Sequence, residues 1–239
     1  MVEKHADKQQ VDKRQVDKRD ADKQQADGPK AGSKPRGRPR SFDRATALEK
    51  ALRIFWERGY EATSVSDLTR AMGIGPPSLY AAFGDKRSLF AEVLVEYGRT
   101  HGSVAGRALE AETTARAGFE RMLREVATAF TEPGHPHGCL VIHAATNCTN
   151  PEVEESLRAQ RNANVADFVR RIQADIDSGQ LPPDADARVL ARHVAAVFQG
   201  MSQQARDGAS AEELEQVARL AMRAWPPAPA AARTESVPG

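Results

Sequence analysis

Histidine and cysteine side chains gather between residues 135 and 148, where they could bind a metal ion. The segment reads H-P-H-G-C-L-V-I-H-A-A-T-N-C. On a helix, Cys139 and His143 would lie one turn apart on one face, and His135 and His137 stand just before them, which gives up to four nitrogen or sulfur ligands. The His-Pro-His approach is typical of a loop, so we predict no metal site here. Metal sensing stays open as an alternative.

The thiol chemistry of the chain is limited to two cysteines, Cys139 and Cys148. If one helix carries both, their spacing separates them by about 180° of rotation and about 13 Å of rise, which is too far for a disulfide. Two cysteines also offer no disulfide framework and fit a reducing compartment. Whether either thiol senses a reagent stays open at this point.

Motifs of several common enzyme classes are absent from the sequence. It contains no G-x-S-x-G nucleophile elbow, no H-E-x-x-H zinc motif, no glycine-rich phosphate loop and no paired carboxylates in a defined setting. We therefore predict that the chain is not an enzyme and takes no cofactor. An enzyme or small-molecule carrier with a basic tail is the rival interpretation.

Positive charge is concentrated in a short segment near the start of the chain. Residues 34–40 read K-P-R-G-R-P-R and carry four positive charges, three of them on Arg36, Arg38 and Arg40. An extended Arg-Gly-Arg stiffened by proline resembles the core of an AT-hook, which lies in the narrow minor groove of A·T-rich DNA. A basic segment that contacts phosphates without sequence preference is the alternative. Both interpretations place double-stranded DNA beside these residues.

The residues before this segment form a degenerate pentapeptide repeat, A/V-D-K-x-x, as far as residue 28. A period of five suits neither a helix nor a strand, because each repeat turns the apolar residue by about 140° around a helix. We therefore predict a disordered extension over residues 1–39, with a coiled coil as the alternative. The proline- and alanine-rich residues 226–239 are predicted to form a disordered tail.

Charge differs between the two ends of the chain, although the net charge is only +1. Residues 1–40 hold 12 Lys/Arg against 7 Asp/Glu, and residues 101–239 hold 14 against 18. This asymmetry favours a polyanionic partner at the N-terminal end and a different task at the other. No apolar run approaches the roughly 18 residues of a membrane helix, and the N-terminus is polar, so we predict a cytoplasmic protein that does not enter a membrane.

Two short helices are predicted between residues 63 and 83, which read T-S-V-S-D-L-T-R-A-M-G-I-G-P-P-S-L-Y-A-A-F. Ser64 and Asp67 match a capping box, and Gly73 stops the first helix with a left-handed conformation. Pro77 opens a second helix that runs to Phe83, roughly 10 Å long, which a major groove about 12 Å wide admits. Two short helices joined by a tight glycine turn are typical of a helix-turn-helix.

Apolar residues recur at helical spacing along most of the remaining chain. Residues 42–58 show this pattern and end at Gly59, predicted to be left-handed, and four stretches after residue 100 repeat it. Strand patterns are nearly absent. The predicted fold class is therefore all-α.

The stretch from Arg40 to Tyr97 resembles the N-terminal domain of TetR-family regulators. The resemblance is carried by F-x-x-x-G-Y at residues 55–60, then T-S-V-x-D-L, then M-G-I-x-x-x-S-L-Y-x-x-F-G-x-K-x-x-L-F. Residues 138–225 resemble the C-terminal domains of that family more weakly. The resemblance implies a three-helix DNA-binding domain with a helix-turn-helix over residues 40–100, and a larger C-terminal helical bundle for ligand binding and dimerisation over residues 101–225.

The resemblance also implies roles for individual residues. It assigns Tyr80 and Lys86 to phosphate contacts and Thr63 and Ser78 to supporting contacts. A half-buried packing tyrosine and a plain solvated lysine are the alternatives. Physical chemistry supports Lys86, because free N–H groups at the start of a helix favour an anion. With Ser64 at a helix start and the basic segment, the predicted DNA-binding residues are Arg36, Arg38, Arg40, Thr63, Ser64, Pro76, Pro77, Ser78, Tyr80, Ala81, Ala82 and Lys86.

The second helix departs from the family at two places. Pro76 and Pro77 replace the Lys and Gly of many members, and Ala81 and Ala82 stand where an aromatic or imidazole side chain often follows Leu-Tyr. Fewer side chains can then reach base edges. We expect specificity to depend on methyl contacts to thymine and on DNA shape.

The C-terminal half is predicted to bind a ligand and to form a dimer. An apolar pocket is predicted among Phe119, Met122, Val126, His143, Phe168 and Phe198. The last two helices, near residues 184–206 and 211–225, resemble the pair that forms a four-helix bundle across the two-fold axis in the family; completion of the monomer core is the alternative. The expected function is a homodimeric repressor that an unknown small-molecule effector releases from double-stranded operator DNA. An activator on the same scaffold stays open.

Overall fold

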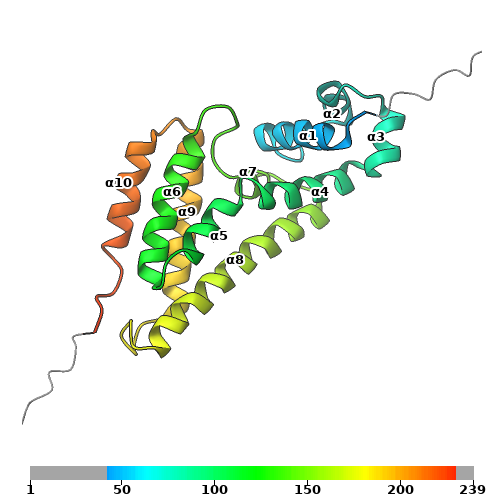
Figure 1. Cartoon of the computed structure of the whole chain (residues 1–239). Helices are drawn as coiled ribbons and strands as arrows, with labels where there is room; N and C mark the ends of the chain where they lie inside the picture. The colour runs from blue at the N-terminus through cyan, green and yellow to red at the C-terminus, as the bar shows by residue number, and fades with distance from the viewer. Residues whose placement is uncertain (1–41, 230–239) are drawn as a thin grey trace, which may run out of the picture. The chain divides into compact units, whose positions relative to one another are not determined.

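The computed structural model describes residues 42–229, and this part of the chain is helical throughout, with no β-strand (Figure 1). Its helices are α1 (Arg44–Arg58), α2 (Val65–Met72), α3 (Pro76–Phe83), α4 (Lys86–Arg99), α5 (Ser103–Glu110), α6 (Ala115–Thr131), α7 (Leu140–His143), α8 (Pro151–Asp177), α9 (Ala187–Arg206) and α10 (Ala211–Met222). The all-α prediction is confirmed. The repeat extension and the basic segment with Arg36, Arg38 and Arg40 lie outside the described residues.

The ends of α1 and α2 follow from local capping chemistry. The Asp43 carboxylate accepts a backbone N–H of the first turn of α1. The predicted capping box is present at α2: the Ser64 hydroxyl accepts the N–H of Asp67, and the Asp67 carboxylate accepts the N–H of Ser64, both at 3.1 Å. Gly73 ends α2 in the left-handed conformation, as predicted. Gly59 after α1 has a positive φ of 79° but an extended ψ of 176°, which corrects the left-handed prediction.

α3 begins at Pro76, one residue earlier than predicted. Both prolines occupy its first turn, where a missing N–H leaves no intrahelical acceptor unpaired. Leu79 and Phe83 are the buried residues of α3. They join a core in which Phe55 of α1 meets Phe90 of α4 edge to face, with ring centroids 4.9 Å apart. This core fixes α3 on α1, α2 and α4.

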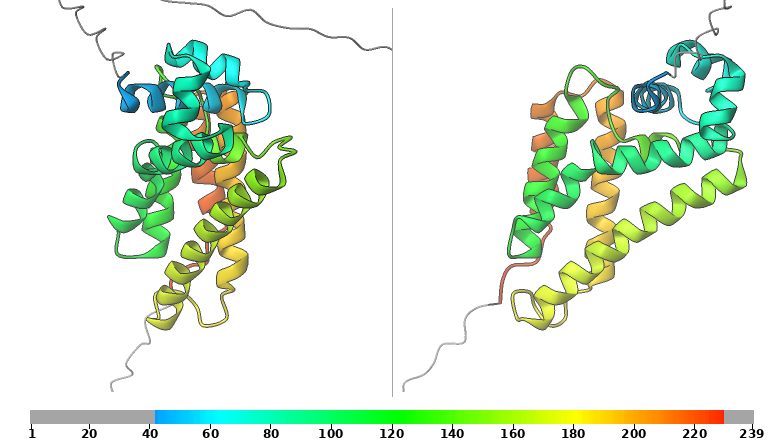
Figure 2. Two further views of the ribbon diagram at one scale, coloured as in Figure 1. Left: turned by 90° about the vertical axis from the view of Figure 1, so that its right-hand side faces the viewer. Right: turned by 45° about the vertical axis from the view of Figure 1, so that its right-hand side comes forward.

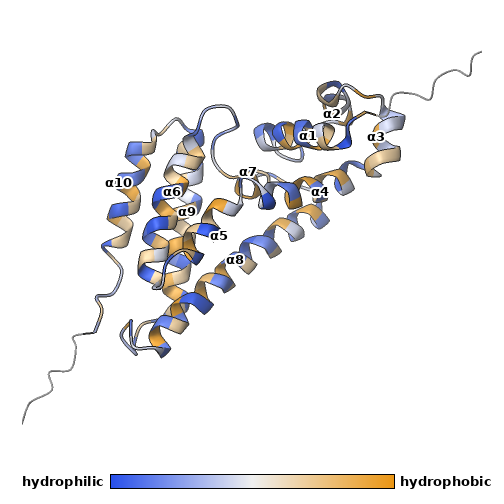
Figure 3. Ribbon diagram, in the orientation of Figure 1, coloured by the Kyte–Doolittle hydropathy of each residue, from blue (hydrophilic) through white to orange (hydrophobic). Residues whose placement is uncertain are grey.

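The helices after α4 extend the same core. α5 packs on α6, α6 also contacts α9 and α10, and α8 packs on α9 (Figures 1 and 2). Figure 3 shows apolar residues alternating with hydrophilic ones along these helices, as expected where one face of each is buried. The largest fully buried side chains here are Phe119, Met122 and Leu123 of α6, Leu140 of α7, and Leu157 and Ile172 of α8.

The helix predicted from Gly138 onward is only one turn long, Leu140–His143. Gly138 has φ 73°, and a Cβ on it would lie 2.5 Å from the carbonyl oxygen of Ser202 on α9, so this close approach requires glycine. The next residue, Cys139, donates its N–H to the Ser202 hydroxyl at 2.8 Å. Cys139 and Cys148 therefore do not share one helix, so their separation as estimated along a single helix was wrong. Both thiols are free.

Candidate functional site

α3 presents an exposed face at one end of the described residues (Figure 1). Pro76, Pro77, Ser78 and Ala81 are exposed, and Tyr80 is 51% exposed. Ala82 is only half-buried, and its carbonyl faces Arg44. No residue of α3 carries a charge, which Figure 3 shows as the absence of deep blue on this helix. A contact made by this face depends on shape, methyl groups and hydroxyl groups.

Thr63 is wholly buried, and its hydroxyl donates to the Gly59 carbonyl at 2.7 Å. Its side chain closes the turn between α1 and α2 and faces no solvent, so the structure corrects the prediction of a DNA contact by this side chain. Ser64 is exposed, although its hydroxyl is engaged with Asp67 in the capping box. From the sequence alone, the Thr of T-S-x-x-D could have been either a buried turn residue or a DNA contact.

Lys86 lies in the first turn of α4, and its ammonium nitrogen is 4.1 Å from the centroid of the Tyr60 ring. Partial burial lowers the pKa of Lys86, while the charge of Glu61 acts in the opposite direction. The Asp85 carboxylate caps α4 by accepting the N–H of Ser88 at 2.6 Å. The Asp85 carboxylate thus already takes one of the N–H groups at this helix start, and the phosphate contact of Lys86 stays a prediction.

Arg44 is a positioning residue that the sequence pattern did not reveal. Its guanidinium donates to the Ala82 carbonyl at the end of α3, pairs with Glu92 of α4 at 2.6 Å, and lies over the Phe83 ring at 4.4 Å. It thereby joins α1, α3 and α4 at the base of the exposed face. Arg44 and Ala82 are 38 positions apart, so helical spacing gives no signal of this contact.

A cavity of about 420 Å³ lies between the helices of the C-terminal half and α1. Of the predicted pocket residues, Val126, Phe168 and Phe198 line it. Phe119 and Met122 are wholly buried in the core and do not line it, which corrects their assignment. His143 is also absent from its walls, because it lies beside Gly59 near the end of α1.

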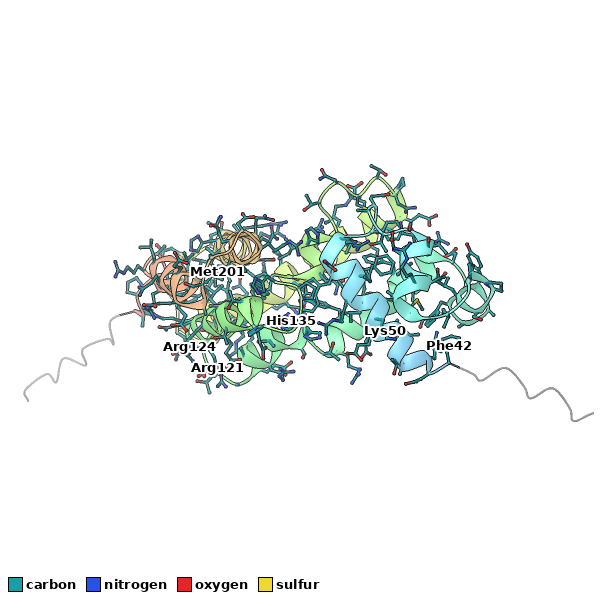
Figure 4. All side chains as sticks on the ribbon, turned by 90° about the horizontal axis from the view of Figure 1, so that it is seen from above. Phe42, Lys50, Arg121, Arg124, His135 and Met201 are labelled. Atoms are coloured by element: carbon teal, nitrogen blue, oxygen red, sulfur yellow. The ribbon has the colours of Figure 1, made fainter. Side chains whose placement is uncertain are left out.

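An aromatic cluster forms the end of the cavity next to α1, and sequence reasoning missed it. The Trp56 and His135 rings are stacked with centroids 4.7 Å apart, and Tyr97 and His101 meet Trp56 edge to face at 5.0 and 4.8 Å. Figure 4 shows His135 between α1 and the helices of the C-terminal half. Burial, followed by the neighbouring His135, lowers the pKa of His101. The cavity thus touches α1 directly.

Arg206 at the end of α9 holds the last turn of α1. Its guanidinium donates to the carbonyls of Glu57 at 3.1 Å, His137 at 3.2 Å and Trp56 at 3.4 Å. We call this contact the Arg206 latch. The carbonyls at the end of a helix lack intrahelical partners and carry partial negative charge, which a guanidinium satisfies. α9 and the cavity wall at Trp56 are joined through it.

A second connection links the helix-turn-helix region to the start of α8. The Glu61 carboxylate accepts the N–H groups of Thr149 at 2.8 Å and Asn150 at 2.9 Å, which lower its pKa. Arg87 of α4 pairs with Glu152 in the first turn of α8. The start of α8 is therefore joined through Glu61 to the turn after α1 and through Arg87 to α4.

Residues 42–229 contain neither a cluster of metal-binding side chains nor a membrane-spanning helix. No group of three or more His, Cys, Asp or Glu side chains within this range could hold a metal ion. No helix in the same range is long and apolar enough to cross a membrane.

Comparison with known proteins identifies the family. Residues 47–93 match the model of the bacterial regulatory proteins of the tetR family, and residues 120–221 match the tetracyclin repressor-like C-terminal domain. The chain is 37% identical over 202 residues to the HTH-type transcriptional repressor ComR of Escherichia coli K12, covering 81% of this chain and 93% of ComR. It is 30% identical over 195 residues to the repressor BdcR of the same strain, covering 80% and 93%.

A solved structure extends the similarity to the fold. A cysteine mutant of the TetR-family transcriptional regulator CifR, in complex with a 26-bp double-strand operator DNA, is 44% identical with a TM-score of 0.75, covering 79% of this chain and 100% of that one. The chain therefore belongs to the tetR family of bacterial regulatory proteins and is a helix-turn-helix transcriptional regulator.

Proposed function

We propose that this protein is a repressor that binds operator DNA as a homodimer and leaves it when a small molecule occupies the cavity. The observation that carries the proposal is the exposed, uncharged face of α3, held on a hydrophobic core by Leu79 and Phe83. The operator complex of CifR and the repressor names of ComR and BdcR support it.

In this proposal α3 enters the major groove. Pro76, Pro77, Ser78, Tyr80 and Ala81 form the contact face, with Ala82 at its edge. Pro and Ala side chains present apolar surface, which suits the methyl groups of thymine. Tyr80 and Lys86 are proposed to contact the phosphate backbone, with supporting contacts from Ser64 and Ser78, and Arg36, Arg38 and Arg40 to add nonspecific or minor-groove contacts.

The homodimer is proposed to form through α9 and α10. Val189 of α9 and Val217 and Leu220 of α10 are large apolar side chains that are 62%, 44% and 64% exposed. Ala196 and Gly200 are also exposed on α9, and small residues let two helices approach closely. Exposed apolar surface on a pair of helices is typical of an interface with a second copy.

Release is proposed to follow from the two connections between the halves. A ligand can shift the population away from the DNA-bound state only if it binds the two states with different affinity. Trp56 of α1 lines the cavity, and the Arg206 latch joins α1 to α9. A ligand that changes the spacing of these helices therefore changes the position of α3.

The proposed domain limits are residues 40–100 for DNA binding and 101–225 for the ligand and the dimer. The proposed location of the protein is the cytoplasm.

The test is a footprint of the purified full chain on the DNA upstream of its own gene. We expect a protected pseudo-palindrome whose half-site centres are about 34 Å apart, one turn of DNA. Affinity should fall steeply as salt rises. A monomer that shows no salt-sensitive affinity for any double-stranded fragment would refute the proposal.

A further inference from the structure

Arg161 of α8 is a half-buried residue that lines the cavity, and one nitrogen of its guanidinium lacks a partner. Its Nη1 atom is buried and donates to no hydrogen-bond acceptor within residues 42–229. Three other buried side-chain nitrogens in this range also lack partners, on His143, Arg171 and Trp225, but none of these residues lines the cavity. Arg161 is thus the residue whose unpaired donor borders the empty volume.

The carboxylates in the cavity wall do not neutralise Arg161. Asp167 pairs with Arg170, one turn further along α8. The Glu132 side chain is 63% exposed and lies 3.8 Å from His135. A buried donor without an acceptor is unfavourable, because it has lost its hydrogen bonds to water and gained none from the protein. Polar groups that border a cavity without a hydrogen-bond partner are typical of binding sites.

The surroundings of Arg161 divide into a polar and an apolar part. The polar part holds the thiol of Cys139 and the hydroxyl of Tyr97, and Arg161 is close enough to act on the thiol through its charge. Burial raises the pKa of Cys139, so the thiol is neutral and can donate a hydrogen bond. The apolar part is formed by Phe130 and Phe198, whose ring centroids are 5.2 Å apart, with Phe168 nearby in the wall.

We propose that the effector is a small organic anion whose carboxylate or sulfonate pairs with Arg161 and whose apolar, ring-sized body lies against the phenylalanines. This assignment rests on the effector site of the proposed function. The guanidinium presents a planar fork of donors that matches such an anion. The cavity volume of about 420 Å³ suits a ligand of one to a few rings.

The test uses two dyes with the same rings that differ by one anionic group. These are 1-anilinonaphthalene-8-sulfonate and the neutral N-phenyl-1-naphthylamine, titrated into the full chain by fluorescence. We expect the sulfonate to bind at one site per chain and 4-phenylbutyrate, but not its amide, to displace it. Arg161→Gln should weaken sulfonate binding about tenfold or more, because a charge-assisted hydrogen bond in a buried site is lost, and should leave the neutral dye unchanged.

Matched variants separate this effect from misfolding. Arg158→Gln removes a charge from the same helix at an exposed position, where Arg158 pairs with Glu154 and Glu155, and should bind both dyes as the wild type does. Arg161→Met should raise the melting temperature of the ligand-free protein, because it removes a buried donor that has no acceptor. A merely structural Arg161 predicts the opposite change.

Three results would overturn the assignment: absence of binding by either dye, equal affinity of the wild type for both, or an Arg161→Gln variant that keeps its affinity for the sulfonate. Failure of the proposed function looks different. Anion binding that depends on Arg161 but leaves DNA affinity unchanged would sustain the ligand class and refute ligand-driven release.

Discussion

Replacing Arg206 with methionine should loosen the end of α1 and uncouple it from α9. The guanidinium satisfies carbonyls at 3.1, 3.2 and 3.4 Å. A hydrogen bond from a charged donor contributes about 1.5–3 kcal/mol when buried. The three distances are at the long end of the range for hydrogen bonds, and Arg206 is only half-buried. We therefore take about 1 kcal/mol for each of the two shorter bonds and little for the third. The expected loss of unfolding free energy is about 2 kcal/mol.

Urea unfolding measures this loss at a fixed protein concentration, since the stability of a dimer depends on concentration. With a slope of roughly 2–3 kcal/mol/M, the midpoint should fall by about 0.7–1 M. The urea midpoint of Arg206→Lys should lie between those of the wild type and Arg206→Met, because one ammonium group cannot donate to three separated carbonyls. Arg124→Met is the control, since Arg124 is an exposed arginine of α6 (Figure 4).

The same variant tests the coupling. Arg206→Met should keep operator affinity within a few-fold in the absence of ligand, because α3 and its core are untouched. The ability of a cavity ligand to weaken DNA binding should decrease. If Arg206→Met unfolds at the same urea concentration as Arg124→Met, the latch makes no net contribution and the reasoning fails.

Four further changes have expected outcomes. Lys86→Ala should weaken binding to all DNA sequences alike and reduce the salt slope by about one, measured by fluorescence anisotropy; a loss confined to one sequence would contradict a phosphate contact. Leu220→Glu should shift the sedimentation coefficient toward that of a monomer, and an unchanged dimer would place the interface elsewhere. Gly138→Ala should lower the unfolding free energy by more than about 2 kcal/mol, because the left-handed backbone and the carbonyl of Ser202 both oppose a Cβ; an equal melting temperature would argue against that approach. Hydrogen bonds from Ser64 lower the pKa of Asp67 below 3.8, so its contribution to stability should be present above that pH and disappear as the pH falls through the lowered value; a pH titration of unfolding in Asp67→Asn should lack this step.

Local chemistry explains which elements could be predicted. Ser64, Asp67 and Gly73 each act on backbone groups within three or four residues, so their spacing in the sequence carries the whole signal. The last two helices were also placed closely, near residues 184–206 and 211–225 against Ala187–Arg206 and Ala211–Met222, because their apolar residues recur at helical spacing.

The cavity could not be predicted in the same way. Phe119, Met122 and Val126 share one face of α6, yet only Val126 lines the cavity, because successive turns of a helix meet different neighbours. Phe119 packs on Trp225 instead, with ring centroids 5.4 Å apart. Helical periodicity identifies the buried face but not the partner across it. For the same reason Trp56 and His135, 79 positions apart, gave no sign of stacking.

The Arg206 latch contacts only main-chain oxygens, and this determines which substitutions it tolerates. Every amino acid supplies a carbonyl, so the residues at positions 57 and 137 are free to change in size and charge while the guanidinium keeps its acceptors. Surface residues of α1 can therefore diverge between related proteins, for instance to suit a different operator, without loss of communication with α9. Only changes that shift the backbone of this turn, or that remove the arginine itself, would break that communication.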